Sequence, residues 1–275
     1  DALLLIALDH LLTRAASIGA VALPFAQSLM LGSMALALLP IDRALKWKIL
    51  KRAKLARAAH EDVIVIGVTG SVGKTTTKEL IGHVLAPLGA VATPAHVNTE
   101  LGVAAWLTNT LHKATIPPML VIEMGAYKRG EIALLASIAE PNIGVVTAVG
   151  TQHLALFGSA ENIWRAKSEL VESLPNEGHA FLNGDDDGCR RMKDIAPCPV
   201  TLVGTGGAAD VEALEIEETP KGLQFKVNGT LFSIAMRGTH NIRNILLAIA
   251  VARHLDMSDA QIAEQLKSFA PPSHT

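Results

Sequence analysis

The sequence is poor in cysteine, with only Cys189 and Cys198 among its 275 residues. Their spacing matches no metal-binding motif, which excludes a cysteine-based metal site. We therefore expect both to be reduced side chains with a structural role. The sequence also lacks internal repeats and low-complexity tracts, and its apolar content is ample for the core of one large domain or two small ones.

Charge is absent from Ala15 to Leu39, a stretch of 25 residues. A helix of this length spans the hydrocarbon core of a bilayer, and glycine and Pro24 are tolerated in such helices. One alternative is a buried core helix, although charge-free helices of this length are uncommon in soluble domains. Another is a secretory signal peptide, since residues 35–37 (Ala-Leu-Ala) resemble a cleavage site. We favour a membrane anchor over residues 15–39.

Basic residues crowd the C-terminal flank of this stretch. Between Ile41 and His60, seven lysines and arginines stand against Asp42 alone, a net charge of +6 in a chain whose total is −2. Such a block is typical of proteins that bind nucleic acid or membrane surfaces. The apolar stretch before it favours the membrane over nucleic acid, and by the positive-inside rule the basic side is cytoplasmic.

The segment GVTGSVGKTTT at residues 67–77 follows the apolar run Val63–Ile66. A β-branched run bounded by glycine indicates a buried, parallel strand. Gly70 and Gly73 allow the chain to turn tightly with its N–H groups pointing inward. The segment therefore predicts a phosphate-binding loop, although Val68 stands where the usual P-loop motif has glycine. The alternative is an ordinary glycine-rich turn between a strand and a helix.

The residues after these glycines favour a nucleotide. Lys74 is placed to reach the β- and γ-phosphates and Thr75 to bind Mg²⁺, while the helix that begins near Lys74 directs its positive end at the anion. A nucleotide site also argues against a signal peptide, because export would separate the site from ATP.

Strands and helices alternate along the next hundred residues. We expect apolar strands at 119–122, 143–148 and 180–182, with helices at 130–139 and 160–173. This alternation predicts an α/β fold with a doubly wound, mostly parallel sheet.

A different pattern follows from Asp210 to Ala235, where short segments alternate in polarity around the turn Asn228–Gly229. It predicts a small antiparallel β flap on the edge of the sheet. Two helices are expected near residues 241–255 and 258–269.

Ligands of such sheets bind beyond the carboxyl ends of the strands. Glu123 ends one predicted strand, and His153 lies in the segment after another. Alone, each is a weak signal, since a charged residue often ends a strand at the surface. Together with the phosphate loop they predict a metal–nucleotide site, in which a carboxylate suits Mg²⁺ better than an imidazole does.

Residues 69–75 resemble the shortened phosphate loop of the Mur ligases, the ATP-dependent amide-forming enzymes of peptidoglycan synthesis. The block Glu123–Ala126 and the segment around His153 resemble the branch that adds D-alanyl-D-alanine to the UDP-linked tripeptide. Further blocks follow in the family's order over residues 62–275: Asn98-Thr99 with Gly102, Gly130–Ile132, Ala166–Leu170, Asn183 with Asp185-Asp186, and Gly238–Asn241 with Asn244.

The resemblance implies a role for many of these positions. The ATP phosphates would be held by Thr69, Gly70, Ser71, Val72, Gly73, Lys74, Thr75 and Thr76. The base and ribose would be lined by Asn183, His240, Asn241 and Asn244, and the other substrate would contact Asn98 and Thr99. Mg²⁺ would be held by Thr75, Glu123, His153 and Lys167, the last as a carbamylated lysine.

The implied reaction transfers the γ-phosphate of ATP to a substrate carboxylate and gives an acyl phosphate that an amine attacks. The substrates would be a UDP-linked or lipid-linked muramoyl peptide and D-alanyl-D-alanine, and Lys74, Lys167, Glu123 and His153 would be the catalytic residues. From the sequence alone, Lys167 would be taken for a solvated lysine on a helix. By this resemblance the chain would work at the cytoplasmic face of the bacterial inner membrane.

Three segments are expected: an apolar, transmembrane segment at 1–40, a basic juxtamembrane linker at 41–61, and an ATP-binding domain at 62–275. Residues 1–61 are too short and too apolar to be the UDP-sugar-binding domain of the family. Because the chain begins at Asp1 and the family has a further C-terminal domain, we expect a fragment that does not turn over by itself.

Two other functions remain open at this point. One is a folate polyglutamate ligase of the same superfamily, against which the residues after Glu123 and the basic segment argue. The other is a membrane-tethered P-loop ATPase or partner-binding module, in which hydrolysis drives an interaction and Lys167 has no use.

Overall fold

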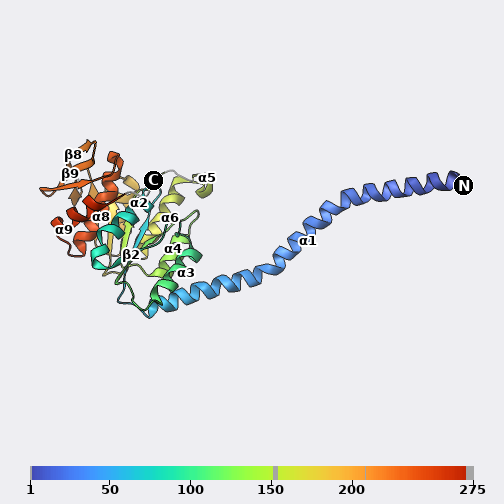
Figure 1. Ribbon diagram of the computed structural model, residues 1–275, viewed down its shortest axis with the longest axis horizontal. Helices are drawn as coiled ribbons and strands as arrows, with labels where there is room; N and C mark the ends of the chain where they lie inside the picture. The colour runs from blue at the N-terminus through green and yellow to red at the C-terminus, as the bar shows by residue number, and fades with distance from the viewer. Residues whose placement is uncertain (1, 151–153, 208, 271–275) are drawn as a thin grey trace. The chain divides into compact units, whose positions relative to one another are not determined.

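The computed structural model describes residues 2–150, 154–207 and 209–270. The chain divides into two compact units, Asp1–Lys48 and Ile49–Thr275. The first unit is the N-terminal part of the long helix α1 (Ala2–Ala58), drawn in blue in Figure 1. Large apolar side chains described in this unit, among them Leu29, Met30 and Leu36, are exposed.

The second unit is built on a seven-stranded sheet with the order β2-β3-β1-β4-β5-β6-β7. Every pair in it is parallel, which confirms the predicted doubly wound sheet. The strands are β1 (Ile64–Thr69), β2 (Ala90–Ala92), β3 (Met119–Glu123), β4 (Ile143–Val146), β5 (His179–Asn183), β6 (Val200–Gly204) and β7 (Val211–Glu212).

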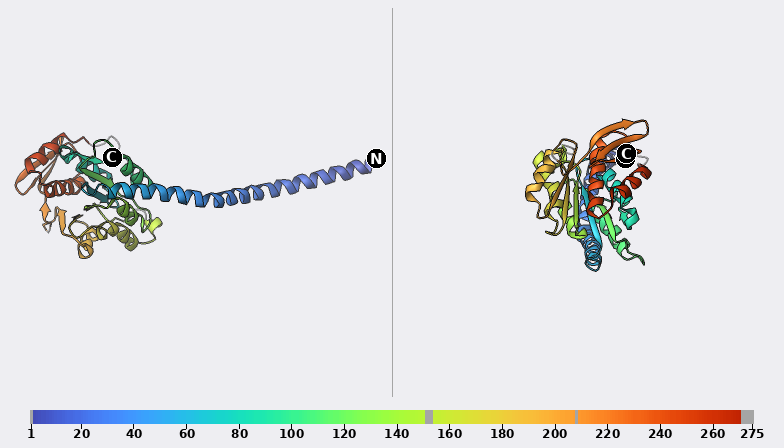
Figure 2. Two further views of the ribbon diagram at one scale, coloured as in Figure 1. Left: turned by 90° about the horizontal axis from the view of Figure 1, so that it is seen from below. Right: turned by 90° about the vertical axis from the view of Figure 1, so that its left-hand side faces the viewer.

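Helices cover both faces of this sheet (Figure 2). Val65 points into one core and Ile66 into the other, because successive side chains of a strand alternate between faces. One core contains α2 (Lys74–Val84), α8 (Ile242–His254) and α9 (Asp259–Ser268). The opposite core contains α3 (Glu100–Leu111), α4 (Glu131–Ala139), α6 (Ala160–Glu172) and the end of α1. The short helices α5 (Leu154–Phe157) and α7 (Asp187–Arg191) complete the second unit.

The predicted flap is a separate antiparallel sheet of β8 (Leu214–Thr219), β9 (Gly222–Val227) and β10 (Thr230–Ile234). Its predicted turn is confirmed: Asn228 and Gly229 have φ of 51° and 82°, as a type I′ hairpin requires. One part of the prediction was wrong, because Val211–Glu212 does not belong to the flap. These two residues pair in parallel with Val203 and Gly204 as the last strand of the main sheet.

The last turns of α1 belong to the second unit. Ala53 and Ala56 are buried in the core with α3 and α4. The guanidinium of Arg57 is buried and donates hydrogen bonds to the carbonyl oxygens of Ala139 (3.0 Å) and Glu140 (3.3 Å). The boundary between the two units therefore lies inside the segment predicted as a linker, at Lys48.

Both cysteines are free, as predicted, and both are buried. Burial raises the pKa of the Cys189 thiol well above its usual value, so this thiol stays protonated and unreactive.

Candidate functional site

The phosphate loop connects β1 to α2 at the point where the order of the sheet reverses, since β3 and β4 lie on opposite sides of β1. This is the position at which doubly wound sheets bind ligands. Both loop glycines are required by the structure. A Cβ atom on Gly70 would lie 2.0 Å from Thr147 Oγ1, and one on Gly73 would lie 2.5 Å from Asn244 Oδ1.

The N-terminus of α2 is open to an anion. Gly73 precedes the helix with φ of 81°, and no side chain caps its first N–H groups. The ammonium group of Lys74 lies over the loop and donates a hydrogen bond to the Ser71 carbonyl oxygen (3.2 Å). Burial lowers the pKa of Lys74, and the charge of Glu123 opposes that shift. These groups concentrate positive potential at one place.

Glu123 ends β3 with its side chain only 3% exposed. Its Oε2 accepts a hydrogen bond from Thr75 Oγ1 (2.9 Å), and its Oε1 accepts one from Asn98 Nδ2 (3.0 Å). The sequence did not indicate Thr93, whose hydroxyl oxygen accepts a hydrogen bond from the Glu123 N–H (3.2 Å). Two neutral side chains, Thr75 and Asn98, thus hold the carboxylate beside the first turn of α2, while Thr93 holds the Glu123 backbone.

The donor set around Glu123 suits Mg²⁺. A carboxylate and a hydroxyl oxygen already in contact are hard ligands of the kind this ion takes, and Mg²⁺ usually completes its shell with phosphate and water. Among residues 2–150, 154–207 and 209–270, no group of three or more His, Cys, Asp or Glu side chains is placed to hold a metal by itself. His153, the predicted ligand of a second ion, lies outside the described residues.

Lys167 lies on α6 and is not solvated, because only 3% of it is exposed. Its ammonium nitrogen lies 5.8 Å from the centre of the Phe157 ring. Burial, and then the charge of Lys74, lower the pKa of Lys167 to about 8, against the opposing effect of Glu169 and Glu131. A buried lysine with a lowered pKa beside a phosphate loop is typical of functional sites.

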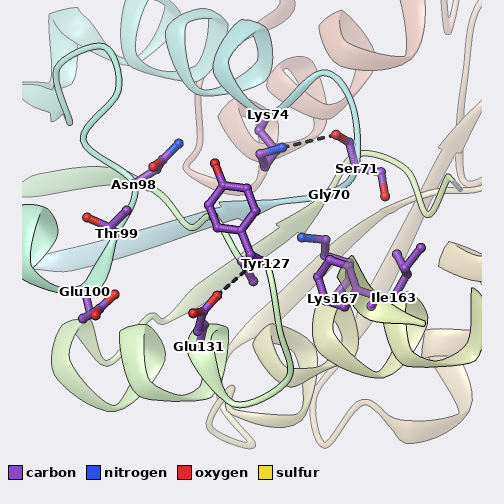
Figure 3. A pocket seen from close by; sticks show the side chains of 13 residues that line it. Gly70, Ser71, Lys74, Asn98, Thr99, Glu100, Tyr127, Glu131, Ile163 and Lys167 are labelled. Atoms are coloured by element: carbon purple, nitrogen blue, oxygen red, sulfur yellow. Dashed lines mark hydrogen bonds between the residues drawn. The ribbon is translucent and has the colours of Figure 1, made fainter. Parts of the chain in front are cut away.

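A pocket lies between Lys74 on one side and Lys167 on the other (Figure 3). Asn98 and Thr99, the predicted substrate residues, line it. Tyr127 stands between them and Lys167, and its backbone N–H donates a hydrogen bond to Glu131 Oε2 (2.7 Å). Sequence reasoning missed four lining residues: Glu100, Tyr127, Phe157 and Ile163. Glu100 and Tyr127 directly follow predicted motifs. Glu131, which also lines the pocket, lies in the predicted block Gly130–Ile132, to which no role was assigned.

A second pocket opens on the other side of the phosphate loop. It brings together every residue that was expected around the base and ribose: Asn183, His240, Asn241 and Asn244, with Val72, Gly73 and Thr76 of the loop. The Asn183 amide is held by a hydrogen bond to the Thr147 carbonyl oxygen (2.8 Å).

Arg243 also lines this second pocket and was not predicted. Its Nε donates a hydrogen bond to Asp185 Oδ2 (2.7 Å), and Asp185 accepts further hydrogen bonds from the backbone N–H and the hydroxyl of Thr205. Burial alone would raise the pKa of Asp185, but the hydrogen bonds from Arg243 and Thr205 lower it below its usual value. The carboxylate therefore stays ionised and fixes Arg243 at the edge of the pocket.

Residues 68–252 match the family model described as the Mur ligase middle domain. The chain belongs to this family. A relative from Mycobacterium bovis named UDP-N-acetylmuramoyl-tripeptide--D-alanyl-D-alanine ligase is 39% identical over 233 residues, covering 80% of this chain and 45% of that protein. A relative of the same name from a Synechocystis species is also 39% identical, over 208 residues, covering 75% of this chain and 44% of that protein.

Solved structures of Mur ligases have the same fold as this chain, which agrees with its assignment to the family. MurF from Acinetobacter baumannii superimposes with a TM-score of 0.77 at 29% identity, covering 83% of this chain and 51% of that one. MurF ligase from Thermotoga maritima, solved in complex with ADP, gives a TM-score of 0.71 at 29% identity, with 82% and 53% covered. The chain spans about half the length of the relatives it matches.

Proposed function

We propose that this Mur ligase domain binds ATP and Mg²⁺ in a protein that adds D-alanyl-D-alanine to a UDP-linked muramoyl tripeptide in peptidoglycan precursor synthesis. The observation that carries the proposal is the pair of pockets that meet at the phosphate loop. One pocket has amide, imidazole and guanidinium groups for a nucleoside. The other has two lysines beside residues that can position an acceptor carboxylate. The names of the relatives support the same reaction.

The chain's own residues account for the binding of the phosphates. The N–H groups of the loop and of the first turn of α2 would hold them, and Lys74 would add a full positive charge. The partly buried site strengthens each of these interactions relative to water. Phosphoryl transfer depends mainly on such positioning and charge stabilisation, because charge spreads over the transferring oxygens.

Thr75 and Glu123 would hold Mg²⁺, which when bound neutralises phosphate charge. His153 would serve a second ion. Asn98 keeps the Glu123 carboxylate in place, and Asn98 and Thr99 line the pocket where the acceptor carboxylate would meet the γ-phosphate. The product of the transfer is an acyl phosphate and ADP. The amine of D-alanyl-D-alanine then attacks the acyl carbon, and inorganic phosphate leaves.

Lys167 has the protonation behaviour that carbamylation needs. Only the neutral amine attacks the carbon of CO₂, after which the nitrogen loses a proton and a carbamate remains. With a pKa of about 8, roughly a quarter of the Lys167 side chains are neutral at pH 7.5, far more than for a lysine at its ordinary value. The carbamate would place a carboxylate-like group opposite Lys74 in the same pocket.

The test follows phosphate release by the full-length protein with ATP, Mg²⁺, the UDP-linked tripeptide and D-alanyl-D-alanine. We expect release to require both substrates and to be lost in Lys74→Ala, while Lys221→Ala in the exposed β8–β9 turn retains it. Release that is indifferent to both substrates would instead support an ATPase. Release with a folate and glutamate would support a folate polyglutamate ligase.

We also propose that residues 15–39 anchor the protein to the membrane, with the second unit on the cytoplasmic face. By length and composition alone, the helical segment Ala26–Ala58 is able to cross a bilayer, and it shares residues 26–39 with the proposed anchor. Trp47, eight residues beyond Leu39, is exposed, and indole rings favour the membrane interface. An enzyme anchored in this way would meet a muramoyl peptide substrate that is either UDP-linked or lipid-linked.

Removal of residues 1–40 tests the anchor without touching Ala53, Ala56 or Arg57, which are part of the second unit's core. We expect the shortened protein to leave the membrane fraction. Full activity on the UDP-linked substrate after this deletion would count against a lipid-linked one.

A further inference from the structure

A third pocket lies apart from the nucleotide site, between the last turns of α1 and the C-terminal half of α3. The groups that line it include Arg52, His60 and His112, with the polar side chains of Thr108 and Asn109. No carboxylate lines this pocket. All of these residues belong to the second unit.

The basic groups are available for an external anion. Within the described part of the chain, the Arg52 guanidinium has no hydrogen-bond or ion-pair partner, and it is exposed. His112 Nδ1 lies 2.6 Å from the Thr108 carbonyl oxygen. Since a carbonyl oxygen only accepts, Nδ1 carries the hydrogen, and Nε2 remains to bind a ligand when the ring is protonated.

A simpler explanation is that basic residues stabilise the negative ends of helices. It applies to His112, which directly follows α3. It does not apply to Arg52, because Arg52 lies six residues before the end of α1 and the dipole effect is confined to the last turn. The charges of Glu140, Glu61 and Asp62 act on the buried Arg57. Arg52 is therefore a solvent-exposed charge that a helix dipole does not use and that an external anion can reach.

Chain connectivity limits the distance between this pocket and any bilayer that residues 15–39 cross. Arg52 follows Leu39 by thirteen residues, a separation that even an extended chain limits to about 45 Å. The inner leaflet of a bacterial membrane presents anionic phosphate groups, which attract basic segments beside a membrane span. The exposed side chain of Leu55, on the pocket wall, adds an apolar surface for the lipid's glycerol and acyl region.

We propose that this pocket binds the phosphate headgroup of an anionic membrane lipid, with the Arg52 guanidinium as the donor to the phosphate oxygens and the His60 and His112 rings beside it. The proposal rests on the membrane anchorage proposed above and is independent of the ligase reaction. Headgroup binding would fix the orientation of the second unit at the bilayer, in addition to the tether that α1 provides.

The test uses the full chain in phosphatidylcholine bicelles, titrated with short-chain phosphatidylglycerol, while the ring resonances of His60 and His112 are followed by NMR. We expect saturable shifts of both. Arg52→Gln should weaken binding about five- to tenfold, the loss expected for one basic contact with an anionic lipid. Lys54→Gln is the matched control, since it removes the same charge from the same exposed segment but does not line the pocket.

Three results would overturn the proposal. Equal weakening in Lys54→Gln would show attraction to the whole basic segment rather than a site. Equal shifts with inorganic phosphate at the same concentration would show a site for free anions. The absence of shifts at both histidines would show that no headgroup enters. Sedimentation with neutral phosphatidylcholine vesicles tests the anchor separately, because it does not depend on Arg52. Phosphate release in Arg52→Gln should equal that of the unmodified protein.

Discussion

The hydroxyl of Thr75 donates a hydrogen bond to Glu123 Oε2 across 2.9 Å, and this contact joins the first turn of α2 to the end of β3. The two residues are 48 positions apart in the sequence. Their oxygens are the protein ligands proposed for Mg²⁺, so the contact places both ligands before any ion arrives. Preorganisation of this kind avoids rearrangement at the moment of reaction.

Loss of the Thr75 hydroxyl or of the Glu123 charge should therefore impair the reaction. We expect Thr75→Val and Glu123→Gln to lower phosphate release of the full-length protein by about 100-fold, the range seen for the loss of one charge-stabilising group. Thr75→Ser retains the hydroxyl and should stay within a few-fold of the unmodified protein. The concentration of Mg²⁺ at half-maximal rate should rise in Glu123→Gln. An unchanged Mg²⁺ dependence would show that Glu123 does not hold the ion.

The geometry of the phosphate loop gives a prediction with a close control. Gly73 and Gly158 have φ of 81° and 76°, but a Cβ on Gly73 would lie 2.5 Å from Asn244 Oδ1, whereas nothing lies within 4 Å of one on Gly158. Gly158→Ala should lower the free energy of unfolding by only about 1 kcal/mol, the strain of a residue with a Cβ in the left-handed region. Gly73→Ala adds the clash, so it should lose more stability and most nucleotide affinity, measured by thermal unfolding and calorimetry. Equal effects of both would exclude a role for the close contact with Asn244.

The loop could be predicted because its signals are local. A β-branched strand, two glycines, a lysine and a threonine lie within a dozen residues, and each implies a backbone or ligand geometry by itself. The hairpin turn Asn228–Gly229 was predictable for the same reason. The parallel sheet followed from the alternation of strands and helices, which also depends on neighbouring residues.

Features that depend on distant contacts were not predictable in this way. β2 consists of Ala90, Val91 and Ala92, which form a strand only because β3 pairs with them. Lys167 was taken for a solvated lysine because of its charge, although it shares a helix face with the buried Ile163, Leu170 and Val171. The contacts that complete its surroundings come from α5 and the phosphate loop, which are distant in the sequence or cannot be placed from it. The end of α1 was taken for a linker because its basic residues are conspicuous, while the buried Ala53 and Ala56 carry no signal of their own.

Asp185 and Arg243, 58 residues apart, give a prediction about the nucleoside pocket. If Asp185 acts by fixing Arg243, then Asp185→Asn and Arg243→Gln should each weaken ATP binding by about tenfold. The double variant should then bind ATP no more weakly than either single variant does. Calorimetric titration of the full-length protein measures all three. Additive losses would show that the two residues act separately. Arg237→Gln, which removes an arginine that does not line the pocket, is the control.

Buried Thr77 makes a prediction about stability rather than activity. Among the described residues, its hydroxyl is the buried side-chain group that has no hydrogen-bond partner. Thr77→Val keeps the shape and removes the unsatisfied group, so the free energy of unfolding should rise by about 1 kcal/mol. Chemical denaturation measures the change. A loss of stability would mean that the hydroxyl has a partner, such as a bound water.

Lys167 gives a prediction about pH. Its folded pKa of about 8 lies below the ordinary value of 10.5. Below pH 8 the protein therefore bears the full penalty for burying the charge, about 3 kcal/mol, and the penalty falls as the pH rises toward 10.5 because the unfolded chain then binds more protons than the folded one. In CO₂-free buffer, Lys167→Met should be more stable than the unmodified protein at pH 7, and the difference should shrink by about half at pH 9.5. The charge of Lys74 contributes to the lowering of the Lys167 pKa. The stability that Lys167→Met gains at pH 7 should therefore be smaller when Lys74 is also replaced by methionine. A difference that does not change with pH would show that Lys167 is not the group that titrates.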